Sequence, residues 1–431
     1  MNRFTKQRLA YGVLLLGLFF ELGFQTFLKR SLGPYWSPLV WTLAGLTVAG
    51  AGLWLFARKT PETAPGASTT LPRWAGVAIV AAVFLAGCAL TFFRVWPVFD
   101  EFPIDPNQSD VIPSMQYYVQ RFLRGETVYA PMPFSTWTIQ PPYLTMTWLP
   151  YTIPELLKID YRWLALGAFY GIFGIYVGRL VVLRRSLPEI VLKTVLPFGM
   201  LWLLIVYDRY IFGHSVELTI VAFYLFLALT LFHKRPWFMA VGIVICLLSR
   251  YAFTFWLPAY LVMLWIGKGF KPAFATGLYT LLGVLLLYIL PFWIKDPGIL
   301  KRGLDYYEQT AIGQWQTQPW QEPGARPFHL DQGLSFAILF YDFGNGTAQD
   351  RLAANRTAQL WVCLLAAVGL AFGYYFWKKR GLDSRLYALG SLKAYLTIFY
   401  AFLHVPFSYL FMVPLFLTVA VVYEVRASML E

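Results

Sequence analysis

This chain of 431 residues has little charge, since Asp, Glu, Lys and Arg together make up only 13% of it. A soluble chain of this length needs more charge to cover its surface, so the composition excludes an ordinary soluble protein. Hydrophobic residues make up 58% of the sequence and the mean hydropathy is +0.56, values typical of integral membrane proteins. We therefore predict an all-α polytopic membrane protein.

The sequence is also poor in cysteine and in the motifs of soluble enzymes. Its three cysteines, Cys88, Cys246 and Cys363, lie inside apolar runs, so we expect packed thiols and no disulfide framework. It contains no glycine-rich nucleotide loop, no HExxH, no GxSxG, no DxD and no histidine-rich ligand set. We predict neither a tightly held metal nor a cofactor.

The net charge of +13 comes from short basic clusters that separate the apolar runs. This pattern indicates membrane orientation and not nucleic-acid binding. Six clusters fall on one side of a twelve-span threading: Arg3/Lys6/Arg8, Arg58/Lys59/Arg73, Arg184/Arg185/Lys193, His233/Lys234/Arg235, Lys268/Lys271 and Lys378/Lys379/Arg380/Arg385. We expect that side to be cytoplasmic, with both termini there, in a bacterial inner membrane. Lys29/Arg30 is the exception among the short loops.

Apolar runs of about 20 residues are long enough to cross a bilayer. They lie near 9–28, 38–57, 74–96, 162–183, 189–206, 215–232, 273–294, 357–377, 386–404 and 407–424. A further run over 237–267 is interrupted by Ser249-Arg250, which predicts two short helices that meet at Arg250. About twelve spans result, with two long external segments, 97–161 and 295–356.

The same threading divides the chain into four parts. Residues 1–60 form a transmembrane hairpin, 61–73 a cytoplasmic linker, 74–425 the main transmembrane domain and 426–431 a cytoplasmic tail. The linker is predicted from its Pro, Gly, Ser and Thr content.

The first external segment contains a short amphipathic pattern. Apolar residues recur at helical spacing at Met115, Tyr118, Val119, Phe122 and Leu123. We predict a helix of about three turns in the outer membrane interface, with Arg121 and Arg124 directed at headgroups or phosphates. The proline-rich stretch 140–160 that follows is expected to dip into the membrane as irregular backbone.

Polar side chains are unfavourable in a bilayer, so their positions carry functional information. Most of them gather at the external boundary: Asp100, Glu101, Asp105, Asp110, Asp208, Arg209, His214, Glu217, Arg250 and His404. Structural roles remain open for each, because Asp110 could cap the next helix, Glu217 and Arg250 could form an ion pair, and both histidines could be packed. Lys393 lies deeper and is expected to snorkel towards the cytoplasm. The clustering favours a functional site near Asp110.

Four sequence pieces occur in an order that resembles a known family. They are Ser109-Asp110 with Gly125-Glu-Thr-Val128-Tyr129, Gln140-Pro-Pro-Tyr143 with Leu149-Pro150, Phe212-Gly-His-Ser-Val-Glu217, and His404-Val-Pro-Phe-Ser-Tyr409 with Pro414. Together they resemble the GT-C fold glycosyltransferases, most closely the polyprenyl-phosphate-mannose-dependent glycosyltransferase family 87. This chain departs from that family's pattern at Gln140, His214 and Arg250.

The resemblance implies a GT-C-like bundle that transfers a hexose, mannose by preference, on the external face. The donor would be a polyprenyl-phosphate-linked sugar, and the acceptor a hydroxyl of a glycan, a glycolipid or a protein. By this resemblance Asp110 is the general base, and Asp105 and then Asp100-Glu101 are the alternatives. Gln140, His214, Glu217, Arg250 and His404 would bind substrate or its phosphate.

Two other classes of function remain compatible with the sequence. Twelve spans with charged residues also suit a transporter or lipid flippase, although the one-sided long loops and the absence of internal repeats argue against it. The alternative is a non-catalytic subunit of envelope assembly that keeps the GT-C-like core.

Overall fold

The structure is a computed structural model that describes residues 3–29, 31–57, 72–134, 137–183 and 185–425. Most of the linker expected at 61–73 and the whole tail at 426–431 lie outside these residues. The described chain is almost entirely helical, which confirms the all-α prediction. Its one sheet is a two-stranded antiparallel hairpin of β1 Met132–Pro133 and β2 Thr138–Ile139.

Long helices make up the body of the molecule. In chain order they are α1 Arg3–Gln25, α2 Gly33–Ala57, α3 Arg73–Glu101, α7 Tyr161–Val182, α8 Leu187–Tyr207, α10 Glu217–Thr230, α11 Pro236–Leu247, α12 Trp256–Lys268, α13 Phe270–Val284, α17 Ala348–Lys379, α18 Ser384–Ala401 and α19 Met412–Glu424.

Shorter helices connect them. They are α4 Val111–Leu123, α5 Thr145–Trp148, α6 Thr152–Leu157, α9 Arg209–His214, α14 Ile299–Gln314, α15 Phe328–Gln332 and α16 Ala337–Phe343, with 3-10 turns η1 Leu149–Tyr151, η2 Tyr251–Phe253 and η4 Ser408–Phe411 and a π-helical segment η3 Leu285–Trp293 that continues α13.

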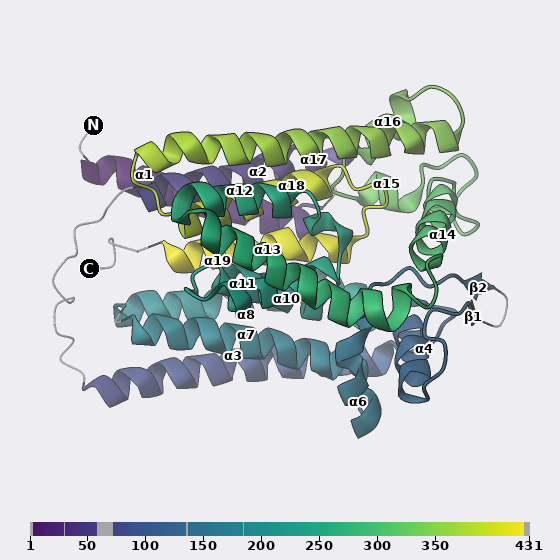
Figure 1. Ribbon diagram of the computed structural model, residues 1–431, viewed down its shortest axis with the longest axis horizontal. Coiled ribbons are helices and arrows are strands. Elements are labelled where there is room, and N and C mark those ends of the chain that lie inside the picture. Colours follow the sequence, from purple (N-terminus) through teal and green to yellow (C-terminus); the bar gives the residue numbers. More distant parts are fainter. Residues whose placement is uncertain (1–2, 30, 58–71, 135–136, 184, 426–431) are drawn as a thin grey trace.

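The long helices run side by side along the long axis of the molecule (Figure 1). Helices α4, α14, α15 and α16 and the β-hairpin gather at one end, and α1 begins and α19 ends at the other. The two long polar segments therefore share one end of the bundle, which we call the loop end. Which side of a membrane this end faces stays a prediction.

Within the described residues, seven helices are long and apolar enough to cross a membrane by length and composition. They lie within α1, α2, α3, α7, α8, α13 with η3, and α17. Three further apolar helices, Glu217–Thr230, Pro236–Leu247 and Ser408–Glu424, are shorter. These observations support a membrane protein, and the total of about twelve spans stays a prediction.

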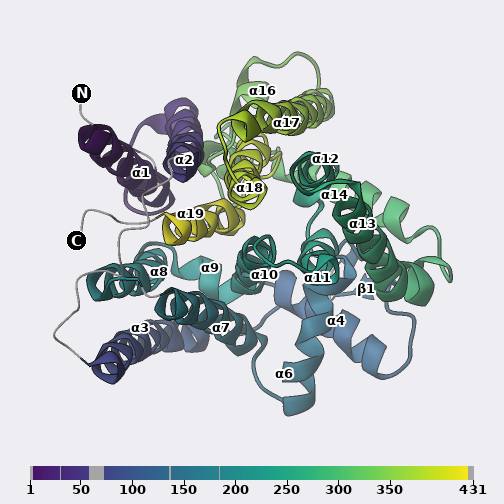
Figure 2. The same ribbon diagram turned by 60° about the vertical axis from the view of Figure 1, so that its left-hand side comes forward.

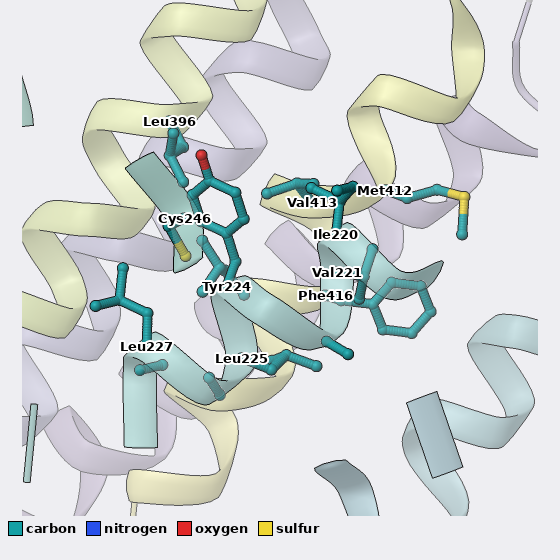
Figure 3. Packing of buried hydrophobic residues seen from close by; sticks show 14 of the residues in the cluster. Ile220, Val221, Tyr224, Leu225, Leu227, Cys246, Leu396, Met412, Val413 and Phe416 are labelled. Carbon is teal, nitrogen blue, oxygen red and sulfur yellow. The ribbon is translucent and has the colours of Figure 1, made fainter. Parts of the chain in front are cut away.

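Helix α19 lies in the middle of the bundle, where it contacts α1, α2, α8, α10 and α18 (Figure 2). Its ten residues from Met412 to Val421 are all buried. On the α10 side, Figure 3 shows Ile220 beside Val413 and Val221 beside Phe416 of α19, while the hydroxyl end of Tyr224 lies beside Leu396 of α18. Since lipid is as apolar as these side chains, close fit rather than exclusion from lipid holds the helices together.

Helices α1 and α2 pack against each other as a hairpin, and α2 also packs on the remaining helices. Helix α2 lies against α18 and α19, where two of its glycines permit the approach. A Cβ on Gly45 would lie 2.6 Å from Thr397, and one on Gly52 would lie 2.6 Å from Val421. Small residues at such contacts let helix backbones come close. The hairpin is therefore part of the bundle.

A buried ion pair joins the hairpin to α18 and corrects one expectation. Lys393 does not snorkel: it is 0% exposed, forms an ion pair with Glu21 of α1 and donates to the Pro414 carbonyl at 2.8 Å. The hydroxyl of Thr418 donates to the other Glu21 oxygen at 2.5 Å. Partners within reach hold the Lys393 ammonium in place, so its stem does not extend to the membrane surface.

The interrupted run at 237–267 folds as predicted. Helix α11 ends at Leu247 and α12 begins at Trp256, with Arg250 in the break between them. The stretch 140–160 is also broken as predicted, into α5, η1 and α6. Its entry into the membrane stays a prediction.

Candidate active site

Asp110 stands at the start of α4 but does not cap it. It occupies the N-cap position, yet its side chain makes no capping hydrogen bond to the helix. Its carboxylate is mostly buried, and burial raises its pKa above the usual range. The capping role left open for this residue is thus not realised, and burial favours the protonated form of its carboxyl group.

The neighbouring acidic residues differ from Asp110 in being exposed or already engaged. Glu101 forms an ion pair with Arg209, and Asp100 is exposed. The Asp105 carboxylate accepts hydrogen bonds from the backbone and side-chain nitrogens of Asn107, both at 2.9 Å. Among these four, burial without a capping role singles out Asp110.

Arg162 fixes the backbone on which the Asp110 segment rests. It is 4% exposed, and it donates to the carbonyls of Phe99, Phe102 and Gly213 at 3.1, 2.6 and 2.9 Å. A Cβ on Gly213 would lie 2.6 Å from Phe102, so only glycine permits this approach. The end of α3 and the end of α9 are thereby held together.

The Ser109 hydroxyl continues this attachment. It donates to the His214 carbonyl at 3.3 Å, which brings the residue before Asp110 to the end of α9. The hydroxyl of Tyr210 donates to the Gln108 carbonyl at 3.3 Å. The two residues before Asp110 are therefore both hydrogen-bonded to α9.

The proline-rich segment is attached to the helix break at Arg250. Met146 donates its backbone N–H to the Leu248 carbonyl at 2.9 Å, and Thr147 donates its hydroxyl to the Ser249 carbonyl at 2.9 Å. These contacts satisfy carbonyls that the break leaves without helical partners. Gln140, at the start of the segment, has a buried side-chain oxygen without a partner in the described chain.

Arg250 and Glu217 form an ion pair, as the sequence allowed. Glu217 is 3% exposed, and the Arg250 side chain is 22% exposed. Buried Oε1 of Glu217 and buried Nε of Arg250 have no partner within the described residues. The pair thus keeps hydrogen-bonding capacity that the protein itself does not use.

Two tyrosines link this pair to Asp110. Burial raises the pKa of Tyr143, and the charge of Asp110 raises it further while that of Arg250 lowers it. Tyr409 of η4 likewise lies within electrostatic range of both Asp110 and Arg250. A carboxylate and a cation from distant parts of the chain therefore lie within electrostatic range of the same two tyrosines.

The two histidines predicted near the site are not cations. Burial lowers the pKa of His214, and the charge of Arg162 lowers it further. Burial lowers the pKa of His404 to about 4, with a contribution from Arg356. Both imidazoles are neutral near pH 7, so each offers one donor and one acceptor to a substrate and no positive charge. Their buried atoms His214 Nε2 and His404 Nδ1 lack partners within the described chain.

The predicted helix 111–123 is present, but its two arginines differ. Arg121 donates to the Ala130 carbonyl and, at 2.8 Å, to the Pro131 carbonyl, so it holds the loop before the β-hairpin. Arg124 is exposed, 3.9 Å from Glu126. A contact with headgroups or phosphates stays a prediction for both.

Two buried polar residues did not stand out in the sequence. Arg162 begins an apolar helix, and its role depends on carbonyls about 50 to 60 residues away in the chain. Asn355 is fully buried in α17, and in the sequence it belongs to an Asn-Arg-Thr pattern that resembles a glycosylation acceptor. Its position within a long helix is the signal that favours a different role.

No group of three or more potential metal ligands exists among the described residues. Comparison with family models, with curated proteins and with solved structures finds no match to this chain. The site must therefore be interpreted from its own residues.

Proposed function

We propose that this protein is a membrane glycosyltransferase that moves a sugar from a polyprenyl-phosphate donor to an acceptor hydroxyl on the external face. The observation that carries the proposal is Asp110, a mostly buried carboxylate with a raised pKa that does not cap its helix. It shares Tyr143 and Tyr409 with Arg250, the cation candidate. A base and a cation within electrostatic range of the same two tyrosines suit the transfer of a sugar whose leaving group is a phosphate.

The mechanism follows from these two charges. The Asp110 carboxylate takes the proton of the acceptor hydroxyl as the oxygen of that hydroxyl forms its bond to C1 of the sugar. The bond from C1 to the phosphate oxygen breaks, and the electron pair leaves with the lipid phosphate. Arg250 stabilises that negative charge, and neutral His214 and Gln140 donate or accept hydrogen bonds to the substrate. Attack opposite the leaving group inverts C1.

An apolar groove offers a place for the lipid chain. It has a volume of about 380 Å³ and lies between α12 and α13, lined by Leu261, Trp265, Phe270, Phe274 and Leu278, among others. Helix α12 is the helix that follows the break at Arg250. A lipid with its phosphate at Arg250 would thus have apolar surface along the adjoining helix.

The transporter alternative is less well supported. The long polar segments share one end of the bundle, whereas inverted repeats treat both faces more evenly. A subunit without catalysis does not need an uncapped, buried carboxylate.

Asp110→Asn tests the proposal. The variant should insert and fold normally and lose about 10²- to 10⁴-fold in transfer of mannose from a polyprenyl-phosphate-linked donor, because the amide takes no proton. Asp105→Asn is the matched control and should transfer at close to the wild-type rate. A fully active Asp110→Asn enzyme would exclude the assignment. Proton- or sodium-driven uptake of a solute into vesicles, without any lipid-linked sugar, would favour a transporter.

A further inference from the structure

One polar side chain of α17 is fully buried and has no hydrogen-bond partner among the described residues. Asn355 of α17 is 0% exposed, and neither its amide nitrogen nor its amide oxygen has a partner in the described part of the chain. Buried polar groups in native proteins are nearly always paired, so each exception requires an explanation. A ligand that pairs with both atoms is one such explanation.

The contacts on either side of Asn355 show which way it faces. Leu352 belongs to the same apolar cluster as Val405, and Gln359 donates to the Phe399 carbonyl at 3.1 Å. Residues three and four apart lie on one face of a helix. Asn355 lies between these two contacts, so it faces the end of α18 and the residues that lead to His404.

His404, in the segment that follows α18, also carries a group without a partner in the described chain. It is 9% exposed, and its Nδ1 is buried without a partner among the described residues. The rings of Tyr307 and His404 meet edge to face with centroids 5.1 Å apart. Since the His404 imidazole is neutral near pH 7, it offers hydrogen bonds without charge.

The charges beside this cluster are compensated. Arg356, next to Asn355 in α17, forms an ion pair with Glu308 at 2.5 Å. An anionic group would therefore find a compensated cation here, whereas a neutral hydroxyl-rich group would find donors, acceptors and an aromatic ring. Tyr307 is 39% exposed and lies within electrostatic range of both Arg250 and Arg356, so the cluster adjoins the candidate active site.

We propose that Asn355 and His404, with the ring of Tyr307 beside them, form a subsite that binds the hydroxyl groups of a sugar. This inference rests on the proposed transferase function and divides its site in two. Arg250 receives the phosphate, and Asn355 with His404 receives neutral hydroxyls. The sugar belongs to the donor or to the acceptor, and the hydroxyl chemistry is the same for both.

Asn355→Leu tests the subsite, because leucine has nearly the same size and no polar atom. The thermal unfolding temperature of the purified protein should stay equal or rise, since the variant removes an unsatisfied buried amide. The KM for the sugar that occupies the subsite should rise about 10- to 100-fold, the effect of losing hydrogen bonds to a substrate hydroxyl. Opposite shifts in stability and binding distinguish a ligand site from a structural residue.

Gln359→Leu is the matched control, one turn further along the same face of α17. Its side chain donates to a protein carbonyl, so its loss should lower the unfolding temperature. The KM for the sugar donor and the KM for the acceptor should both stay unchanged. The two probes are a short polyprenyl-phosphate-linked mannose as donor and octyl α-mannoside as acceptor. A KM that rises for only one of them assigns the sugar to that substrate.

Binding gives a readout that does not depend on turnover. Each probe that occupies the subsite should raise the unfolding temperature of the wild type and raise that of Asn355→Leu less. If Asn355→Leu is destabilised as strongly as Gln359→Leu and both probes act on it as on the wild type, the subsite is excluded while the transferase function stands. A wild type that neither transfers mannose nor is stabilised by either probe would overturn the proposed function itself.

Discussion

Two buried ion pairs in this protein use their charges differently. In the pair of Lys393 with Glu21, the ammonium also binds the Pro414 carbonyl and the carboxylate also binds Thr418, and both residues are 0% exposed. In the pair of Arg250 with Glu217, one buried atom of each partner is left without a partner in the described chain. The first pair is satisfied by the protein alone. The second keeps capacity for something else, which is what distinguishes a structural pair from a candidate site.

Removal of one charge from the satisfied pair should have the largest effect on folding. Lys393→Met leaves Glu21 buried without a counter charge, which costs about 3–5 kcal/mol. We expect little folded protein after extraction in detergent, measured by size-exclusion chromatography and thermal unfolding.

The double variant Glu21→Leu with Lys393→Met removes both charges and should recover most of that stability, because apolar replacement of a buried pair is often neutral or stabilising. A double variant as unstable as the single one would show that the helix contacts, and not the charges, depend on Lys393.

Changes in the pair of Arg250 with Glu217 should instead lower activity more than stability. Arg250→Lys keeps a positive charge beside Glu217, so the unfolding temperature should change little. Lysine lacks the planar fork that binds a phosphate at two points, so kcat should fall about 10²- to 10³-fold. Arg302→Lys, at an exposed ion pair with Asp296, is the control and should change neither quantity. Equal losses of stability and activity in Arg250→Lys would make this pair as structural as the first.

The pH dependence of transfer tests Asp110 as the general base. A general base acts in its deprotonated form, and burial raises the pKa of Asp110. The rate should therefore fall, as the pH is lowered, at a pH above the usual range for a carboxyl group. A profile of kcat/KM against pH measures this, and a rate that stays constant down to the usual range would contradict it.

The same raised pKa affects stability. The folded state binds the Asp110 proton more tightly than the unfolded state, so ionisation at higher pH opposes folding. Asp110→Asn should accordingly raise the unfolding temperature at neutral pH, and this gain should vanish at a pH below the ordinary pKa of the carboxyl.

An exposed pair completes the comparison with the smallest effect. Arg124 and Glu126 lie 3.9 Å apart, with side chains 65% and 51% exposed. Surface pairs contribute about 0–1 kcal/mol, so Arg124→Ala should leave the unfolding temperature nearly unchanged. If Arg124→Ala loses much of its activity in anionic lipid vesicles but keeps it in detergent, the result would support the headgroup contact that the sequence predicts.

The sequence predicted those features that depend on local pattern. The helix at 111–123 follows from its apolar spacing, and the break at Arg250 follows from a charge in an apolar run. Long-range pairing was less accessible. Glu21 is a charge inside an apolar run, but nothing near it in the chain indicates Lys393, which was expected to snorkel. Likewise, the sequence could not show that Asp105 is engaged by Asn107 while Asp110 does not cap its helix.

The pair of Glu21 with Lys393 also sets an order of events during synthesis. Its partners are 372 residues apart in the chain. At about 5–20 residues per second, Lys393 follows Glu21 after roughly 20 to 70 seconds. For that interval, Glu21 of α1 has no Lys393 ammonium as its counter charge. Water, lipid headgroups or the insertion machinery must supply its polar partners instead. Helix α1 can therefore complete its contacts with α18 only late in synthesis.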